Sequence, residues 1–242
     1  MKNSIKKRVQ GLFYLFTHPK QVKWLVVRES RFGKRKQSKR DWVEWQKYDA
    51  KVHISMMKKN ADKIDASSLN SARIQIFSEL INTIGNRLNV LDIGCGDGVI
   101  SKPIVKMGNE VVSIELPGVA GLARACGVFS VVAGDAEQLS FAADVFDLIL
   151  ASEVLEHMWN PQKFIEEAKR VLKSDGFLIV ETPEGEGGLN YDSHRYFFTV
   201  ERLKEILGTM FVVCEVKRLE ATGSAQTPTI IVLLRKSFSV KN

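Results

Sequence analysis

The residues best suited to chemistry form a glycine-rich segment, residues 92–98 (DIGCGDG), directly after a short apolar run. Glycines let the backbone turn sharply and let a ligand approach without meeting a Cβ atom. A dinucleotide pyrophosphate would require the pattern GxGxxG. Here the third glycine comes one position early, and Asp97 would lie beside the phosphate at a helix N-terminus. The acidic turn instead favours a ligand that carries an amino group and a sulfonium.

Carboxylates follow the next two apolar runs. Glu115 closes the second run, 21 residues after Gly94, which is close to the spacing at which an acid accepts hydrogen bonds from ribose hydroxyls. Asp135, in the segment GDA after the third run, could accept a hydrogen bond from an adenine amino group. Alone, Glu115 could be a solvated strand-end acid, and Asp135 could belong to an ordinary turn. Together with the glycine-rich segment, Glu115 predicts a nucleoside site.

A third group combines acids with histidines. Glu153, Glu156 and His157 are spaced i, i+3 and i+4, so a helix would place them on one face. His194 follows the fifth apolar run and could reach the same pocket. Two carboxylates and two imidazoles could hold a divalent cation, or Glu156 and His157 could simply stabilise the start of a helix. We take His157 and His194 as candidate catalytic residues and assign no metal ligand.

The elements that must position these residues alternate between short apolar strands and helices. The strands are continuous apolar runs, as expected when helices cover both faces of a sheet. This alternation predicts an α/β, doubly wound, mostly parallel sheet that binds ligands at the carboxyl ends of its strands. The expected strands are 89–93, 110–115, 129–133, 146–151, 176–182, 210–217 and 228–235, and the expected helices between and after them are 99–107, 118–126, 161–172 and 199–207.

Two helix signals add detail to this pattern. Asn160 can cap the helix that begins at Pro161, because proline lacks the N–H that the first helical position leaves unpaired. In the stretch before the first strand, apolar residues from Leu69 to Ile84 recur every 3 to 4 positions. Only Arg73 interrupts that apolar stripe.

The positive charge of the chain is concentrated at its N-terminus. Residues 1–40 hold 13 Lys or Arg against one acid, a balance of +12, whereas residues 41–242 hold 22 against 27, a balance of −5. The basic residues 1–40 could contact an anionic membrane surface or a nucleic acid. We favour a third interpretation, a helical extension that packs on its own domain or on a second copy in a homodimer.

Cysteine usage and hydropathy narrow the class of protein. Cys95, Cys126 and Cys214 lie far apart without a CxxC pair, which favours neither a disulfide framework nor a zinc site and indicates a reducing compartment. No apolar run approaches the ~20 residues of a membrane span, and residues 11–16 are too short for a signal peptide. We expect a cytoplasmic protein, with a peripheral position at the inner membrane surface as an option.

Five ordered motifs resemble the class I S-adenosylmethionine-dependent methyltransferases, in particular the methyltransferase type 11 or ubiquinone-biosynthesis-like branch. They are VLDIGCGDG (90–98), IE (114–115), GDAEQLSF (134–141), FDLILASEVLEHM (146–158) and LKSDGFLIVETP (172–183). The resemblance covers roughly residues 68–217. It implies a Rossmann-like sheet of seven strands with an antiparallel C-terminal hairpin.

The same resemblance implies S-adenosylmethionine as cofactor. Carried over residue by residue, the glycine turn approaches the methionine part, Glu115 binds the ribose, Asp135 and Ala136 meet the adenine, and residues 151–153 line the floor near the transferable methyl group. The implied cofactor-binding residues are Asp92, Gly94, Cys95, Gly96, Glu115, Leu116, Asp135, Ala136, Ala151, Ser152 and Glu153.

Two units are expected: a basic, helical N-terminal extension over 1–67 and a methyltransferase domain over 68–242. Members of the family commonly use such an extension as a lid or a substrate-recognition element. We expect methyl transfer to a hydroxyl or amine of a small molecule, a glycan or a lipid-linked acceptor. The alternatives are 2′-O-type methylation of RNA, with or without a metal, and a non-catalytic cofactor-binding scaffold, because one fold hosts many functions.

Overall fold

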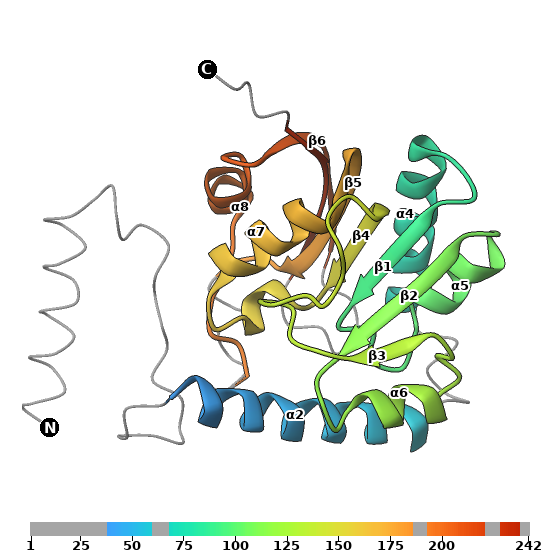
Figure 1. The fold of residues 1–242 in the computed structure, drawn as a ribbon, viewed down its shortest axis with the longest axis vertical. Helices are drawn as coiled ribbons and strands as arrows, with labels where there is room; N and C mark the ends of the chain where they lie inside the picture. The colour runs from blue at the N-terminus through green and yellow to red at the C-terminus, as the bar shows by residue number, and fades with distance from the viewer. Residues whose placement is uncertain (1–37, 60–67, 186–192, 221–227, 238–242) are drawn as a thin grey trace, which may run out of the picture.

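A single seven-stranded sheet organises the computed structural model, which describes residues 38–59, 68–185, 193–220 and 228–237. The strand order is β3-β2-β1-β4-β5-β7-β6 (Figure 1). The pairs among β1 to β5 are parallel, and β7 runs antiparallel to both β5 and β6. The predicted doubly wound sheet with an antiparallel C-terminal hairpin is therefore confirmed.

The strands lie where the apolar runs predicted them, with two differences. The edge strand β3 is shorter than expected, because it pairs with β2 over three residues only and Phe129 before it is 88% exposed. β5 begins earlier than expected, since Leu172 already pairs with Phe146 of β4. The bounds are Asn89–Ile93 (β1), Glu110–Glu115 (β2), Val131–Ala133 (β3), Phe146–Ser152 (β4), Leu172–Pro183 (β5), Phe211–Leu219 (β6) and Thr229–Lys236 (β7).

The four helices predicted after the first strand are also present, and each is a little shorter than expected. Asn160 caps α7 as expected, since its side chain accepts hydrogen bonds from the backbone N–H groups of Gln162 and Lys163, with Pro161 at the first helical position. The bounds are Lys39–Lys59 (α2), Ser68–Ile84 (α4), Ser101–Lys106 (α5), Ala120–Ala125 (α6), Pro161–Val171 (α7) and Val200–Leu207 (α8), with a 3-10 turn at Leu155–His157 (η1).

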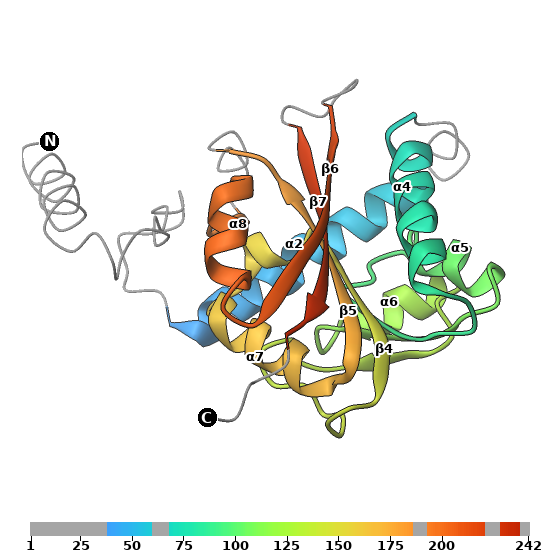
Figure 2. The same ribbon diagram turned by 90° about the horizontal axis from the view of Figure 1, so that it is seen from above.

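Two apolar clusters bury the two faces of the sheet. Because side chains alternate along a strand, neighbours such as Val90 and Leu91 of β1 belong to different clusters. One cluster joins the sheet to α7 and α8, and the other joins it to α4 and α5. Figure 2 shows these two pairs of helices on opposite sides of the strands. The sheet is thus covered on both faces, which leaves its strand ends as the place for a ligand.

Helix α2 lies across the carboxyl ends of the strands, next to α6 (Figure 1). Its Trp42 and Ile54 side chains are both 3% exposed, so α2 packs on the domain. Of the basic residues 1–40, only 38–40 belong to the described residues. The predicted membrane, nucleic-acid and homodimer contacts of that segment fall on residues outside the described part.

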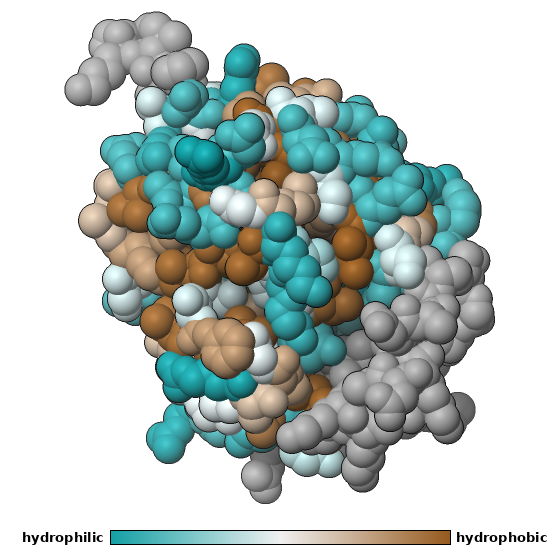
Figure 3. Space-filling model, turned by 90° about the vertical axis from the view of Figure 1, so that its right-hand side faces the viewer, coloured by the Kyte–Doolittle hydropathy of each residue, from teal (hydrophilic) through white to brown (hydrophobic). Residues whose placement is uncertain are grey.

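The surface on the side of α4 and α5 carries both hydrophilic and hydrophobic residues. Figure 3 shows hydrophilic residues there around several separate hydrophobic patches. Among the described residues, no helix combines the length and the apolarity that crossing a bilayer requires.

Candidate active site

The glycine turn between β1 and α5 is shaped by backbone that side chains rarely permit. Gly94, Gly96 and Gly98 have φ values of 71°, 53° and 80°, in the left-handed region that glycine adopts readily. A Cβ atom on Gly94 would lie 2.6 Å from Cγ2 of Val154, whereas one on Gly96 would meet nothing within 4 Å. Gly94 therefore packs against the loop after β4, and Gly96 faces open space, where a ligand could approach the backbone.

The carboxylate of Glu115 is anchored on this turn. Its Oε1 accepts a hydrogen bond from the Gly96 N–H at 3.2 Å, and its Oε2 accepts one from the Leu116 N–H at 2.7 Å. Glu115 is only 8% exposed, and this burial raises the pKa of its carboxyl group. Since each carboxylate oxygen can accept more than one hydrogen bond, Glu115 can still receive the hydroxyls of a ribose.

Asp92 and Cys95 lie beneath the turn. Asp92 is 2% exposed, and burial, together with the negative charge of Glu115, raises the pKa of its carboxyl group to about 7. Cys95 is buried as well, and burial raises the pKa of its thiol. A thiol that stays protonated is a poor nucleophile, so Cys95 contributes packing to the turn.

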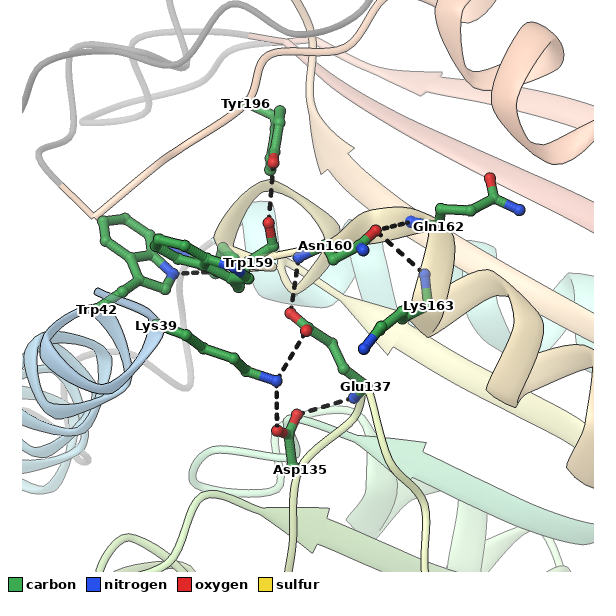
Figure 4. Close-up of polar contacts among 10 residues, drawn as sticks. Lys39, Trp42, Asp135, Glu137, Trp159, Asn160, Gln162, Lys163 and Tyr196 are labelled. Atoms are coloured by element: carbon green, nitrogen blue, oxygen red, sulfur yellow. Dashed lines mark hydrogen bonds and ion pairs between the residues drawn. The ribbon is translucent and has the colours of Figure 1, made fainter. Parts of the chain in front are cut away.

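Asp135 contacts a lysine, Lys39, which no pattern in the sequence predicted to lie there. Its Oδ2 accepts a hydrogen bond from Lys39 Nζ at 2.9 Å, and its Oδ1 accepts one from the Glu137 N–H at 2.9 Å. Lys39 also binds Glu137 Oε2 at 2.9 Å, and Glu137 Oε1 accepts from the Asn160 N–H (Figure 4). The predicted adenine-binding aspartate therefore also anchors the start of α2, while Ala136 beside it packs against the core.

The end of β4 places Ala151, Ser152 and Glu153 together, as the resemblance implied. Ala151 is fully buried and can offer the crevice only its backbone. Ser152 Oγ donates to Glu181 and accepts a hydrogen bond from Arg73 Nη2 at 2.7 Å. Arg73 Nη2 also binds Glu181 Oε2 at 2.8 Å.

Arg73 and Glu181 are site residues that the sequence analysis did not assign. Each carried a signal: Arg73 interrupts the apolar stripe of α4, and Glu181 stands inside the apolar run of β5. Charged residues are seldom fully buried unless they are paired. A charged residue within an apolar stretch therefore indicates a partner of opposite charge. The sequence alone did not identify them as a pair, because 108 residues separate them in the chain.

The carboxyl groups at this end of the crevice stand close together. Glu153 has a left-handed backbone, with φ 56°, and its N–H donates to the Glu181 carbonyl oxygen at 2.9 Å. Burial, and then the negative charges of Glu156 and Glu181, raise the pKa of Glu153 well above its usual value. Burial also raises the pKa of Glu156. Burial and the neighbouring charges therefore disfavour the ionised forms of these two carboxyl groups.

The expectation that Glu153, Glu156 and His157 share one helical face is wrong. The turn η1 is a 3-10 helix of three residues, and the left-handed Glu153 precedes it. His157 Nδ1 lies 2.7 Å from the Ser193 carbonyl oxygen. Because a carbonyl only accepts, Nδ1 carries the proton and Nε2 of the neutral ring is free to accept one.

His157 and His194 do come together, as the sequence analysis expected. Their ring centroids are 4.7 Å apart at an interplanar angle of 88°. One possible ligand atom from each of Glu156, His157 and His194 lies within 4.8 Å of the others. These three residues could hold a divalent cation, whereas Glu153, the fourth residue of the predicted cluster, is not part of this group.

Helix α2 is fastened to the loops that follow several strands. Trp42 Nε1 donates to the His157 carbonyl oxygen at 2.8 Å (Figure 4), and Gln46 Nε2 donates to the Ser193 carbonyl oxygen at 2.9 Å. The Arg195 guanidinium lies over the rings of Trp42 and Trp159, 5.4 and 4.0 Å from their centroids. These contacts make Trp42 a packing residue and, together with Gln46, hold α2 against the loops that follow β4 and β5.

Comparisons with known proteins show similarity to methyltransferases. Residues 91–180 match the model of a family described as a methyltransferase domain. A ubiquinone biosynthesis O-methyltransferase of Azorhizobium caulinodans is 37% identical over 101 residues, which cover 39% of this chain and 40% of that protein. The chain thus spans about two fifths of the length of such relatives.

Two solved structures share the fold. The N-methyltransferase NodS from Bradyrhizobium japonicum WM9, in complex with S-adenosyl-L-homocysteine, has a TM-score of 0.63 and 20% identity, with coverage of 73% of this chain and 91% of that one. A 1,6-didemethyltoxoflavin-N1-methyltransferase from Burkholderia thailandensis has a TM-score of 0.65 and 20% identity, with coverage of 85% and 93%. Residues 91–180 of this chain are therefore similar to a methyltransferase domain, and the whole sheet of seven strands shares the fold of these solved structures.

Proposed function

We propose that this protein is an S-adenosylmethionine-dependent methyltransferase that methylates a hydroxyl or amine of a small molecule, a glycan or a lipid-linked acceptor. The observation that supports it most is the buried carboxylate of Glu115, held against the glycine turn by the Gly96 and Leu116 N–H groups. A preformed acceptor beside an open glycine suits a ribose and the amino acid attached to it. The ligand named for the NodS complex is of this kind.

The other residues that the family resemblance implies would contact successive parts of such a ligand. The glycine turn would face the methionine part, Leu116 and Ala136 would flank the adenine, and Asp135 would accept from its amino group. Gly96 in particular leaves room, since even an added Cβ atom would meet nothing within 4 Å. When bound, S-adenosylmethionine supplies a methyl group that its positive sulfur has already activated.

The chain's own contribution is mainly alignment and exclusion of water. Methyl transfer is an in-line displacement, so the acceptor atom must be held opposite the leaving sulfur, and such positioning can contribute up to ~7–11 kcal/mol of a barrier. The contacts of Trp42 and Gln46 hold α2 across the strand ends. A helix in that position can shield the reacting groups from water.

His157 is the side chain best placed to take a proton from a hydroxyl acceptor. Its Nδ1–H donates to the Ser193 carbonyl oxygen, which leaves Nε2 as the accepting atom. Nε2 lies 4.0 Å from Glu156 Oε1, and that carboxyl group would stabilise the imidazolium after proton uptake. His194 stacks edge-on against the same ring and restricts its orientation.

The acceptor class is the finer part of the proposal. The similarity to ubiquinone biosynthesis O-methyltransferases makes a hydroxyl oxygen the first acceptor atom to test. RNA is the second candidate, supported by the Glu156, His157 and His194 group, whose spacing suits a metal that could position a ribose hydroxyl. If chelation of divalent ions leaves methylation of every acceptor unchanged, the metal-assisted form of either reaction is excluded.

Two measurements test the proposal in sequence. Titration calorimetry should show binding of S-adenosylmethionine or of its demethylated product, and absence of both would overturn the proposal. Incubation with methyl-labelled cofactor and fractionated extract should then place the label in a small-molecule, glycan or lipid fraction. Label confined to RNA would support the second candidate, and binding without any labelled product would favour a non-catalytic scaffold.

A further inference from the structure

One backbone carbonyl group, that of Ser193, is shared between helix α2 and the candidate base His157. Its oxygen accepts a hydrogen bond from Gln46 Nε2 at 2.9 Å and another from His157 Nδ1 at 2.7 Å. Gln46 is 9% exposed and Ser193 is 7% exposed, so water competes little for this oxygen. A carbonyl oxygen has two lone pairs. The two donors therefore use its full accepting capacity.

Helix α2 also holds the backbone of His157 itself. Trp42 Nε1 donates to the His157 carbonyl oxygen at 2.8 Å, and the Trp42 side chain is buried. Trp42 and Gln46 stand at positions i and i+4 of α2, so they lie on the same face of the helix. One face of α2 therefore contacts both the main chain of His157 and the group that accepts from its ring.

The segment that carries Ser193 is tied to η1 by backbone bonds as well. The N–H groups of Arg195 and Tyr196 donate to the Glu156 carbonyl oxygen at 2.8 and 3.2 Å. These bonds keep the segment beside η1, two and three residues beyond Ser193. Gln46 supplies the contact from α2 that sets where the Ser193 carbonyl oxygen itself lies.

The other nitrogen of the His157 ring has a different neighbour. Nε2 lies 4.0 Å from Glu156 Oε1, which is beyond hydrogen-bond distance. If the ring turned towards this carboxyl group, Nε2 would carry the proton and could no longer accept one. The Ser193 carbonyl opposes that turn while it stays within reach of Nδ1. Its position therefore decides which ring nitrogen is left to accept.

We propose that Gln46 is a positioning residue that keeps the proton of His157 on Nδ1 and leaves Nε2 free to accept. This inference rests on the proposed function, in which Nε2 receives the proton of a hydroxyl acceptor. In that step the acceptor oxygen bonds to the methyl carbon, the sulfur keeps both electrons of the broken carbon–sulfur bond, and the hydroxyl proton passes to Nε2. Gln46 acts on the step through the Ser193 carbonyl group.

The proposal gives α2 a part in the chemistry. Trp42 and Gln46 precede residues 91–180, the part of the chain that matches the methyltransferase domain model. The matched part contains His157 but neither of the two α2 side chains that orient it. The proton-accepting site of this chain is therefore completed by a helix outside the matched residues.

Nitrogen NMR of the full chain, labelled at its histidine rings, tests the positioning without any acceptor. Spectra are recorded at alkaline pH, where a histidine ring is neutral, with a chelator present so that no metal ion occupies Nε2. His157→Gln assigns the signals of His157. We expect the Nδ1–H form to predominate in wild type, and Gln46→Met to lower the ratio of Nδ1–H to Nε2–H by about 3- to 10-fold, the effect of one hydrogen bond. The wild-type ratio in Gln46→Met would overturn the proposal.

Two further variants on α2 separate positioning from a general loosening of the helix. Lys47→Met alters the next residue, whose ammonium group binds Glu44, and should keep the wild-type ratio. Trp42→Phe removes the N–H donor to the His157 backbone but keeps an aromatic ring, and it should change the ratio less than Gln46→Met does. A change in Lys47→Met equal to that in Gln46→Met, or a larger one in Trp42→Phe, would contradict a specific role for Gln46.

Calorimetry with S-adenosylmethionine separates this inference from the proposed function. Gln46→Met should bind it as wild type does, because Ser193 is not among the residues assigned to the cofactor. If the wild-type chain does not bind it, the proposed function fails, while the NMR ratio still decides whether Gln46 orients His157. If Gln46→Met loses affinity but keeps the wild-type ratio, the cofactor site stands and the positioning role is wrong.

Discussion

Buried carboxyl groups at the ends of β2 and β4 are stabilised in different ways. At the end of β2, the carboxylate of Glu115 is met by two backbone N–H groups, from Gly96 and Leu116. At the end of β4, Glu156 and Glu181 are met by side chains, chiefly Thr182 and Arg73, and one buried oxygen of each is unpartnered within the described residues. Backbone donors are fixed by the turn itself, so the first end is complete before any ligand arrives. The second end relies instead on a salt bridge and hydrogen bonds between side chains that lie far apart in the sequence.

The two ends also differ in how far apart in the chain their contacting residues lie. The Gly96 and Glu115 contact joins two neighbouring strands of one βαβ unit. The contact of Arg73 with Glu181 joins α4 to the end of β5, across most of the domain. Substitutions at the two ends should therefore fail differently: ligand affinity is lost at the first, and fold stability at the second. The following predictions test that comparison.

The largest effect is expected from Arg73→Met. It would leave Glu181 charged, fully buried and without its guanidinium, a change that typically costs about 3–5 kcal/mol. Urea unfolding should show this loss of stability, and the double variant Arg73→Met/Glu181→Gln should recover most of it because no unpaired charge remains. A single variant within about 0.5 kcal/mol of wild type would show that the β4 end does not depend on this ion pair.

Glu115→Gln should chiefly affect binding. The substitution replaces one accepting oxygen of a charged group with an amide donor, so affinity for both S-adenosyl compounds should fall by about 10- to 100-fold. Glu110→Gln, an exposed change at the start of the same strand, is the matched control for calorimetry. If the two variants bind alike, Glu115 does not hold the ribose.

Gly94→Ala tests the contact between the two ends. The new Cβ would meet Val154 at 2.6 Å in a left-handed backbone, so the unfolding free energy should fall by about 2–3 kcal/mol. Gly108→Ala has the same backbone strain, at φ 89°, but meets nothing within 4 Å. It should therefore lose only about 1 kcal/mol. Equal losses in urea unfolding would mean that the packing of Gly94 on Val154 is unimportant.

The smallest effect is a pH dependence at Asp92. Its pKa is about 7 in the fold and near 3.8 in the unfolded chain. Between these values the folded protein holds a proton that the unfolded chain has released, so this contribution to stability is present at low pH and is lost as the pH rises towards 7. Asp92→Asn should reduce the fall in stability between pH 6 and 7 by about 1 kcal/mol. Parallel pH profiles of the two proteins would contradict the raised pKa.

Local sequence signals were enough to predict the fold class, the alternation of strands and helices, and the glycine turn with Glu115. Apolar runs and turn glycines are local signals, and the glycine turn with Glu115 lies within 22 residues of chain, residues 94–115. The Asn160 cap and Pro161 were readable for the same reason, because capping is settled by a few neighbouring residues. The helical face expected for Glu153, Glu156 and His157 failed, since spacing alone does not reveal a left-handed residue before a short 3-10 turn.

The three-dimensional packing of helices on the sheet sets which distant side chains meet at the site. Lys39 reaches Asp135 across 96 residues of chain, and Arg73 reaches Glu181 across 108. Sequence showed each of these charges as an isolated residue, or as an interruption in an apolar stripe. Their partners follow from how helices dock on the sheet, and docking depends on the packing of whole faces, which no local pattern encodes.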